Sequence, residues 1–93
     1  MPYSVIIEPT AIGELRRLPV DIQRRFLDAL DALTESPFKW NPHIATKQVQ
    51  GRPGLWSLTV SVWRAFYRVD GDTIVVGAFR HRAANPYREL KGR

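Results

Sequence analysis

The stretch LWSLTVSVWRAFYRVDGDTIVVGAF, residues 55–79, follows a hydrophobic period of 2 rather than 3.6. Apolar side chains take every second position from Trp56 to Val62, with serine and threonine between them, which is typical of a half-buried strand. Two further strand-like runs, residues 64–69 and 72–79, are joined by an Asp-Gly pair that suits a tight hairpin. Because hairpins connect neighbouring strands, this half of the chain predicts a three-stranded antiparallel meander.

The N-terminal part of the chain predicts one strand followed by two helices. Residues 3–8 are rich in β-branched side chains and are closed by Pro9, so they predict a first strand. An amphipathic segment then runs to Pro19, and residues 21–36 form a second one that stops at Pro37. The apolar stripe of the second segment consists of Ile22, Phe26, Leu30 and Leu33. The two segments predict a helical hairpin with one apolar face.

The order of these elements predicts an α+β fold: an N-terminal strand, a helical hairpin and the meander. A hairpin with a single apolar face must cover one side of the sheet, which leaves the other side in water. Residues 36–47, between the two parts, are rich in proline and asparagine, and they predict a loop too short for a domain linker. We therefore expect a single domain over residues 1–93, with one modest core.

The positive charge of the chain is concentrated in its second half. The net charge is +5, yet residues 1–46 carry five basic and six acidic side chains, whereas residues 47–93 carry nine basic and three acidic ones. A one-sided basic field attracts polyanions, so nucleic acid is the first partner to consider. The alternative is a surface whose charge only keeps the protein soluble.

The composition excludes several classes of protein. The chain has no cysteine and only two histidines, His43 and His81, so we expect neither disulfides nor a metal site, and no cofactor. No stretch approaches the roughly 20 apolar residues that span a bilayer, and the N-terminus lacks the features of a signal peptide. We therefore expect a cytoplasmic protein without a membrane partner, whose chemistry rests on basic, hydroxyl and carboxylate groups.

The pleat of the strands predicts which side each cation takes. Arg64, Phe66 and Arg68 alternate along one strand and share a face, and burying two arginines without partners is costly, so this face should be open. An exposed Phe66 would suit a base or a protein partner, unless a C-terminal tail covers it. At the end of the last strand, Arg80 and Arg82 should share a side, with His81 on the opposite one.

Three blocks of sequence carry a family resemblance: ELRRLPVDIQRRF (14–26), KQVQGRPGLWSLTVSVWRAFYRV (47–69) and FRHRAANPY (79–87). In this order and spacing they resemble the RelE/ParE superfamily of bacterial toxin–antitoxin toxins, over nearly the whole chain. The resemblance implies a small antiparallel sheet with a helical hairpin on one face, which agrees with the fold expected from periodicity. It also implies a protein antitoxin as partner.

The resemblance to RelE implies cleavage of mRNA on the ribosome, without a metal, by attack of a ribose 2′-OH on the adjacent phosphate. Arg64 would then bind the scissile phosphate, and Tyr87 would stack on a base or assist proton transfer. The candidates for charge stabilisation or proton transfer at the strand end are Arg80, His81 and Arg82. The residues expected to bind the surrounding nucleic acid are Lys47, Arg52, Phe66, Arg68 and Arg88.

Two departures leave the chemistry open between enzyme and inhibitor. In the best-known ribonucleases of the superfamily, the strand that matches WSLTV carries outward lysines, whereas this chain has Ser57 and Thr59. The spacing from His81 to Tyr87 is one residue longer than the commoner one, so the catalytic position among residues 80–82 stays open. ParE-like members keep the sheet arginine but poison DNA gyrase, which is the alternative to ribosome-dependent mRNA cleavage.

Overall fold

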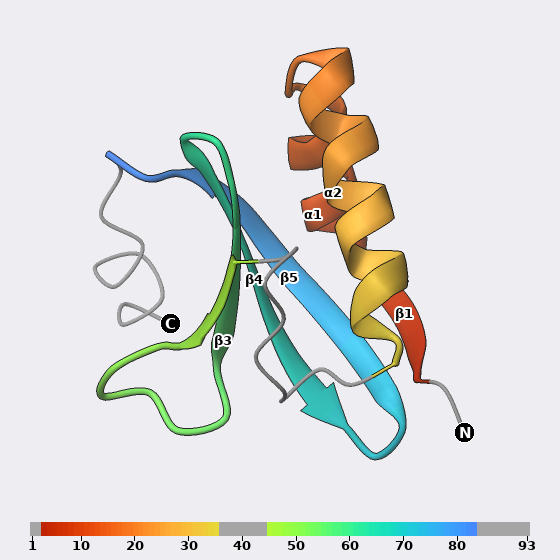
Figure 1. Ribbon diagram of the computed structural model, residues 1–93, viewed down its shortest axis with the longest axis vertical. Helices are drawn as coiled ribbons and strands as arrows, with labels where there is room; N and C mark the ends of the chain where they lie inside the picture. The colour runs from red at the N-terminus through yellow and green to blue at the C-terminus, as the bar shows by residue number, and fades with distance from the viewer. Residues whose placement is uncertain (1–2, 36–44, 84–93) are drawn as a thin grey trace.

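The computed structural model describes residues 3–35 and 45–83. Its elements are β1 (Ser4–Ile7), α1 (Pro9–Arg16), α2 (Val20–Leu33), β2 (Ala45–Gln48), β3 (Trp56–Val60), β4 (Trp63–Asp70) and β5 (Thr73–His81). The strands form one sheet in the order β1-β5-β4-β3-β2 (Figure 1). The α+β fold expected from the sequence is confirmed.

The two helices lie where the sequence predicts, although α2 ends at Leu33, three residues before the predicted end of its segment at residue 36. Pro9 occupies the first turn of α1, where a missing N–H costs nothing. The last carbonyls of α1 lack helical partners, and the side chain of Gln23 in α2 donates to two carbonyls there, that of Leu18 at 2.8 Å and that of Arg16 at 3.2 Å. This pair of hydrogen bonds fixes the turn between the helices.

The sheet contains the predicted meander and one strand that the sequence did not indicate. β3, β4 and β5 pair antiparallel in chain order, and β1 pairs with β5 in parallel, from Ser4 opposite Thr73 to Ile7 opposite Val76. β2 pairs antiparallel with β3. The prediction of a loop over residues 36–47 is therefore wrong at its C-terminal end, because β2 is a short, polar edge strand without apolar alternation.

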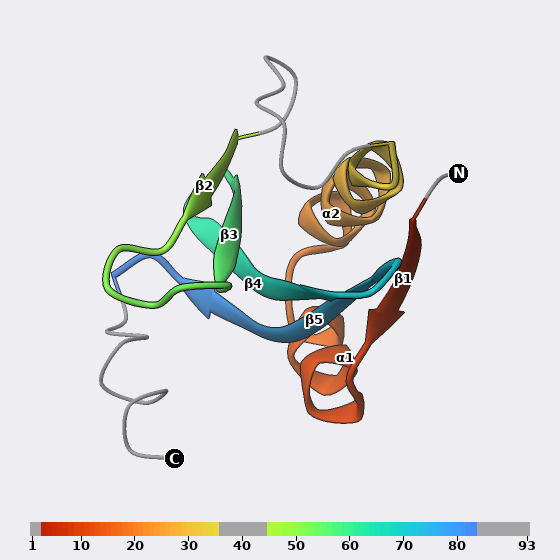
Figure 2. The ribbon, with the colours of Figure 1, turned by 90° about the horizontal axis from the view of Figure 1, so that it is seen from below.

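The main core lies between the helices and one face of the sheet. Figure 2 shows both helices at the β1 side of the sheet, away from β2 and the β2–β3 loop. Phe26 of α2 meets Phe79 of β5 edge to face, with ring centroids 5.1 Å apart. The whole predicted stripe of α2 is buried in this core, together with Leu58, Ala65 and Tyr67 of the sheet.

A second, smaller core covers part of the opposite face of the sheet. Phe66 is only 2% exposed and packs with Val49, Ala78 and Leu55. The expectation of an exposed Phe66 is therefore wrong. The β2–β3 loop folds back over the sheet, and the Val49 N–H donates to the Leu55 carbonyl at 2.8 Å. Among the described residues, the β2–β3 loop covers this ring, and the C-terminal tail that the sequence offered as an alternative cover lies outside them.

A β-bulge in β5 sets which residues share a face. Phe66 pairs with Ala78 and Tyr67 pairs with Val76, so Gly77 has no partner in β4. A Cβ atom at Gly77 would lie 2.9 Å from Oε1 of Glu8, which packs over the bulge. Because of the extra residue, Val76 and Phe79 both face the main core. No helix within residues 3–35 and 45–83 is long and apolar enough to cross a membrane.

We predict that Phe66→Ala lowers the free energy of unfolding by about 3 kcal/mol, because it removes a buried ring and leaves a cavity under the loop. Urea denaturation followed by circular dichroism measures the change. Leu27→Ala is the control, because Leu27 is 50% exposed on α2 and should change stability by no more than about 0.5 kcal/mol. Equal effects of the two substitutions would contradict the second core.

Candidate nucleic-acid interface

The face of the sheet away from the helices carries cations and small hydroxyls, and we call it the outer face. Cross-strand register places Thr59, Arg64 and Arg80 in one row across β3, β4 and β5. The neighbouring row runs through Lys47, Ser57, Phe66 and Ala78. Arg64 therefore lies at the centre of the outer face, between a threonine and a second arginine.

Arg64 is packed in the sheet, yet one of its hydrogen-bond donors has no partner among the described residues. Its side chain is half-buried, and its Nε atom is buried without a hydrogen-bond partner among the described residues. Buried polar groups in proteins almost always have partners, so an exception calls for an explanation. Arg80 lies directly opposite, and like charges in such a position repel. An anion bound at this point would supply the missing acceptor and relieve the repulsion.

Arg80 already has an acid partner. Its Nη1 donates to Oε2 of Glu14 in α1 and to the Phe79 carbonyl at 3.0 Å. The side chains of Arg80 and Glu14 are 22% and 25% exposed, so the pair is shielded from solvent on most sides. The sequence offered no signal for this contact, because Glu14 fits a solvated helix face and stands 66 positions from Arg80.

His81 and Arg82 lie at the exposed end of β5. His81 pairs with Trp63, its ring meets the Trp63 ring edge-on at 5.0 Å, and its Nδ1 accepts from the Ala83 N–H at 3.0 Å. The strand is regular here, so His81 lies on the side opposite Arg80, as expected. Arg82 is exposed just after the strand, where its N–H donates to the Val62 carbonyl at 2.7 Å.

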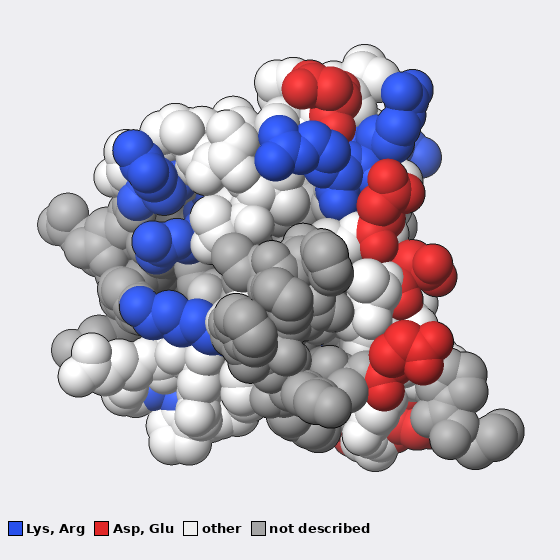
Figure 3. All heavy atoms as spheres, in the orientation of Figure 1, with Lys and Arg blue, Asp and Glu red and all other residues white. Residues whose placement is uncertain are grey.

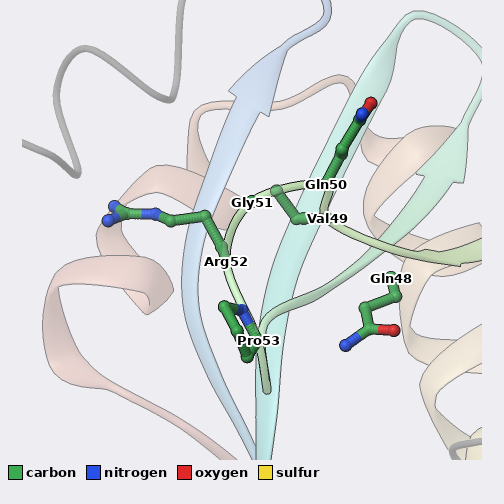
Figure 4. A pocket seen from close by; sticks show the side chains of 6 residues that line it. All are labelled: Gln48, Val49, Gln50, Gly51, Arg52 and Pro53. Carbon is green, nitrogen blue, oxygen red and sulfur yellow. The ribbon is translucent and has the colours of Figure 1, made fainter.

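The remaining predicted cations surround the outer face without meeting Arg64. Lys47 is exposed on β2, and Arg68 is exposed on β4 with its Nη1 3.9 Å from Oε1 of Glu8. Arg52 lines a concave part of the β2–β3 loop, where its side chain and those of Gln48 and Gln50 point apart (Figure 4). This concavity does not gather its polar groups on one ligand. The predicted residues Tyr87 and Arg88 lie outside the described residues.

The charges are separated over the surface. Figure 3 shows Lys and Arg side chains over the strands and a line of Asp and Glu along α2, with a further basic group near the α1–α2 turn. The acidic residues of this line in α2 and just after it are Asp21, Asp28, Asp31 and Glu35. A surface divided in this way orients an approaching polyanion toward the strands.

The side chains on the described part of the outer face are mostly cations rather than groups that exchange protons near neutral pH. Its ionisable side chains are arginines, one lysine, Asp70 at the end of β4 and the two carboxylates that pair with Arg68 and Arg80. Tyr67 faces the main core, and burial raises the pKa of its phenol above the ordinary value, so it stays protonated. Within residues 3–35 and 45–83, no three His, Asp or Glu side chains form a metal-binding group.

Solved structures of RelE toxins have the same fold. The RelE–RelB complex of Pyrococcus horikoshii is 24% identical, with a TM-score of 0.76 over 91% of this chain and 100% of that chain. The RelBE2 toxin–antitoxin complex of Mycobacterium tuberculosis is 28% identical, with a TM-score of 0.71 over 88% and 100%. An arginine-substituted E. coli RelE in the free state is 18% identical, with a TM-score of 0.81 over 99% and 98%. No curated protein sequence matches the chain significantly.

The chain thus has the fold of RelE toxins. A family model described as the ParE toxin of the type II toxin–antitoxin system parDE matches residues 5–86. The chain belongs to this family, and so to the RelE/ParE superfamily that the sequence resembles. It is a toxin of a type II toxin–antitoxin system.

We predict opposite effects on stability for the two facing arginines. Arg64→Met should raise the free energy of unfolding by about 0.5 kcal/mol, because it removes an unsatisfied buried nitrogen and a cross-strand repulsion. Arg80→Met should lower it by about 2 kcal/mol, because it leaves the shielded Glu14 carboxylate without its cation. Thermal and urea unfolding of the two variants test this, and a loss of stability in Arg64→Met would mean that Arg64 has a structural role.

Proposed function

We propose that this toxin inhibits translation by cutting mRNA on the ribosome, with Arg64 as the ligand of the scissile phosphate. The observation that carries the proposal is the buried Nε of Arg64, which has no described partner at the centre of a cationic sheet face. A planar guanidinium that is anchored but unsatisfied is suited to a phosphate.

The proposed reaction needs no metal or cofactor. The ribose 2′-OH loses its proton and attacks the adjacent phosphorus, and the bond to the 5′-oxygen breaks as that oxygen gains a proton. The products are a 2′,3′-cyclic phosphate and a 5′-hydroxyl. The transition state gains negative charge on the phosphoryl oxygens, which Arg64 and the arginines at positions 80 and 82 would stabilise. Proton transfer is assigned to His81 and Tyr87.

We further propose that a cognate antitoxin covers the outer face in the resting state. Four of the similar structures are of RelBE toxin–antitoxin complexes, from P. horikoshii, M. tuberculosis, Methanococcus jannaschii and E. coli. An antitoxin with acidic side chains would supply acceptors for Arg64 and for the exposed cations Lys47 and Arg68. The ribosome and mRNA are then the partners of the released toxin in the cytoplasm.

A second candidate is the poisoning of DNA gyrase without RNA cleavage. Two observations favour it: the matching family model describes a ParE toxin, and among the described residues the central row around Arg64 holds no histidine and no carboxylate other than Glu14, which pairs with Arg80. In this case Arg64 would bind the partner protein or its DNA. Because no RNA would be cut, Ser57 and Thr59 would not need to replace the lysines of the ribonucleases.

We predict that Arg64→Ala slows mRNA cleavage by roughly a hundredfold and relieves growth arrest, since it removes charge stabilisation at the phosphate. Mapping of mRNA 5′ ends after brief induction measures cleavage, and His81→Ala tests the proposed proton transfer in the same way. Arg24→Ala, on the exposed face of α2, is the control and should cleave like the wild type.

Growth arrest with unchanged mRNA 5′ ends would refute the ribonuclease proposal. If purified toxin then inhibited DNA supercoiling by gyrase, and Arg64→Ala abolished that inhibition, the second candidate would take its place. If the Arg64→Ala toxin still arrests growth, and its mRNA cleavage or gyrase inhibition is unchanged, Arg64 has no role in either function.

A further inference from the structure

Glu14 performs two tasks with its two carboxylate oxygens. Oε1 accepts a hydrogen bond from the Phe79 N–H at 3.0 Å, and Oε2 accepts from Nη1 of Arg80. The first contact satisfies a backbone group at the edge of β5 beyond the point where β1 ends. The second neutralises one of the two arginines in the central row of the outer face.

The position of Arg80 matters because Arg64 lies directly across from it. The cross-strand pairing places Arg64 and Arg80 side by side, so their guanidinium groups could bind one phosphate together. Of these two arginines, only Arg64 has a buried donor without an acceptor among the described residues. The Arg80 side chain instead contacts Glu14 in α1. The carboxylate of Glu14 and an incoming phosphate therefore compete for the same cation.

We propose that Glu14 is a positioning residue that holds Arg80 back from the outer face until a phosphodiester bound at Arg64 draws it away. The inference rests on the proposed binding of RNA by this face. Glu14 then lowers the affinity of the toxin for RNA. The free energy needed to break its ion pair with Arg80 reduces the gain from any phosphate contact that Arg80 makes. The Phe79 contact lets the helix stay in place while the guanidinium leaves, because it uses the other oxygen.

Glu14→Gln separates the two tasks. The amide oxygen of glutamine can still accept from the Phe79 N–H, but the charge that retains Arg80 is gone. The probe is a ten-nucleotide single-stranded RNA with a 2′-O-methyl group on every ribose, which the proposed reaction cannot cut. Its binding is measured by fluorescence anisotropy at several salt concentrations, and thermal unfolding checks that each variant is folded.

We expect Glu14→Gln to bind this RNA roughly three- to tenfold more tightly than the wild type. Its plot of log K against log salt should also steepen by about 0.7, because one more phosphate is neutralised. Both effects should vanish in the Arg80→Gln background, since Glu14 acts through Arg80. A purely structural Glu14 would change stability but not the salt slope.

Asp28→Asn is the matched control for removing a negative charge. Asp28 is exposed on α2, which packs on the face of the sheet opposite Arg64. It should bind the RNA like the wild type. Nitrogen-15 NMR adds a direct readout: on adding RNA, the Arg80 guanidinium signals should shift while the Phe79 amide signal stays.

The possible failures are distinguishable. If Arg64→Ala loses affinity but Glu14→Gln gains none, the role of Glu14 is refuted and the binding of RNA by the outer face stands. If Glu14→Gln gains affinity equally with and without Arg80, the effect is general electrostatics, and the inference is refuted. If neither the wild type nor Glu14→Gln binds the RNA, both this inference and the proposed RNA-directed function fall.

Discussion

The single extra residue at Gly77 determines what the outer face of this toxin contains. Side chains alternate along a strand, so the inward direction of Val76 would by itself send Arg80 toward the main core. The bulge reverses that phase, and Phe79 packs inward while Arg80 turns outward beside Arg64. Without this reversal, the core would lose an aromatic ring and receive a guanidinium, which costs several kcal/mol even when it is partly paired.

A second dependence follows at the edge of β5. β1 is too short to pair with the whole strand, and after Val76 the edge is covered by α1, from which Glu14 accepts the Phe79 N–H. Uncovered strand edges invite unwanted pairing, so this contact protects the sheet. The same carboxylate sets the charge state of the central row, so the fold and the binding surface share one residue. A substitution of Glu14 that alters the binding surface therefore also affects the fold.

The features that the sequence predicted are those that local pattern determines. Periodicity predicted the helices, the meander and the face of the sheet on which Arg64 lies, and the short sequence blocks indicated the family. The features that it missed depend on distant contacts: β2 is polar and exists only as a partner of β3, and Phe66 is buried only because Val49 and Leu55 fold over it. The pairing of Glu14 with Arg80 has no local signature at all.

The chemistry open to the outer face follows from how its hydroxyls are used. Ser57, which stands where the best-known ribonucleases have a lysine, is buried, and its hydroxyl donates to the Lys47 carbonyl at 3.5 Å. This serine is therefore part of the β2–β3 pairing and is not poised to take a proton from RNA. The centre of the face can bind a phosphate and stabilise its charge, whereas His81, at the end of β5, lies on the opposite side of the sheet from Arg64. A ribonuclease built on this sheet would thus bind the phosphate with Arg64 and take its proton-transfer groups from outside the central row.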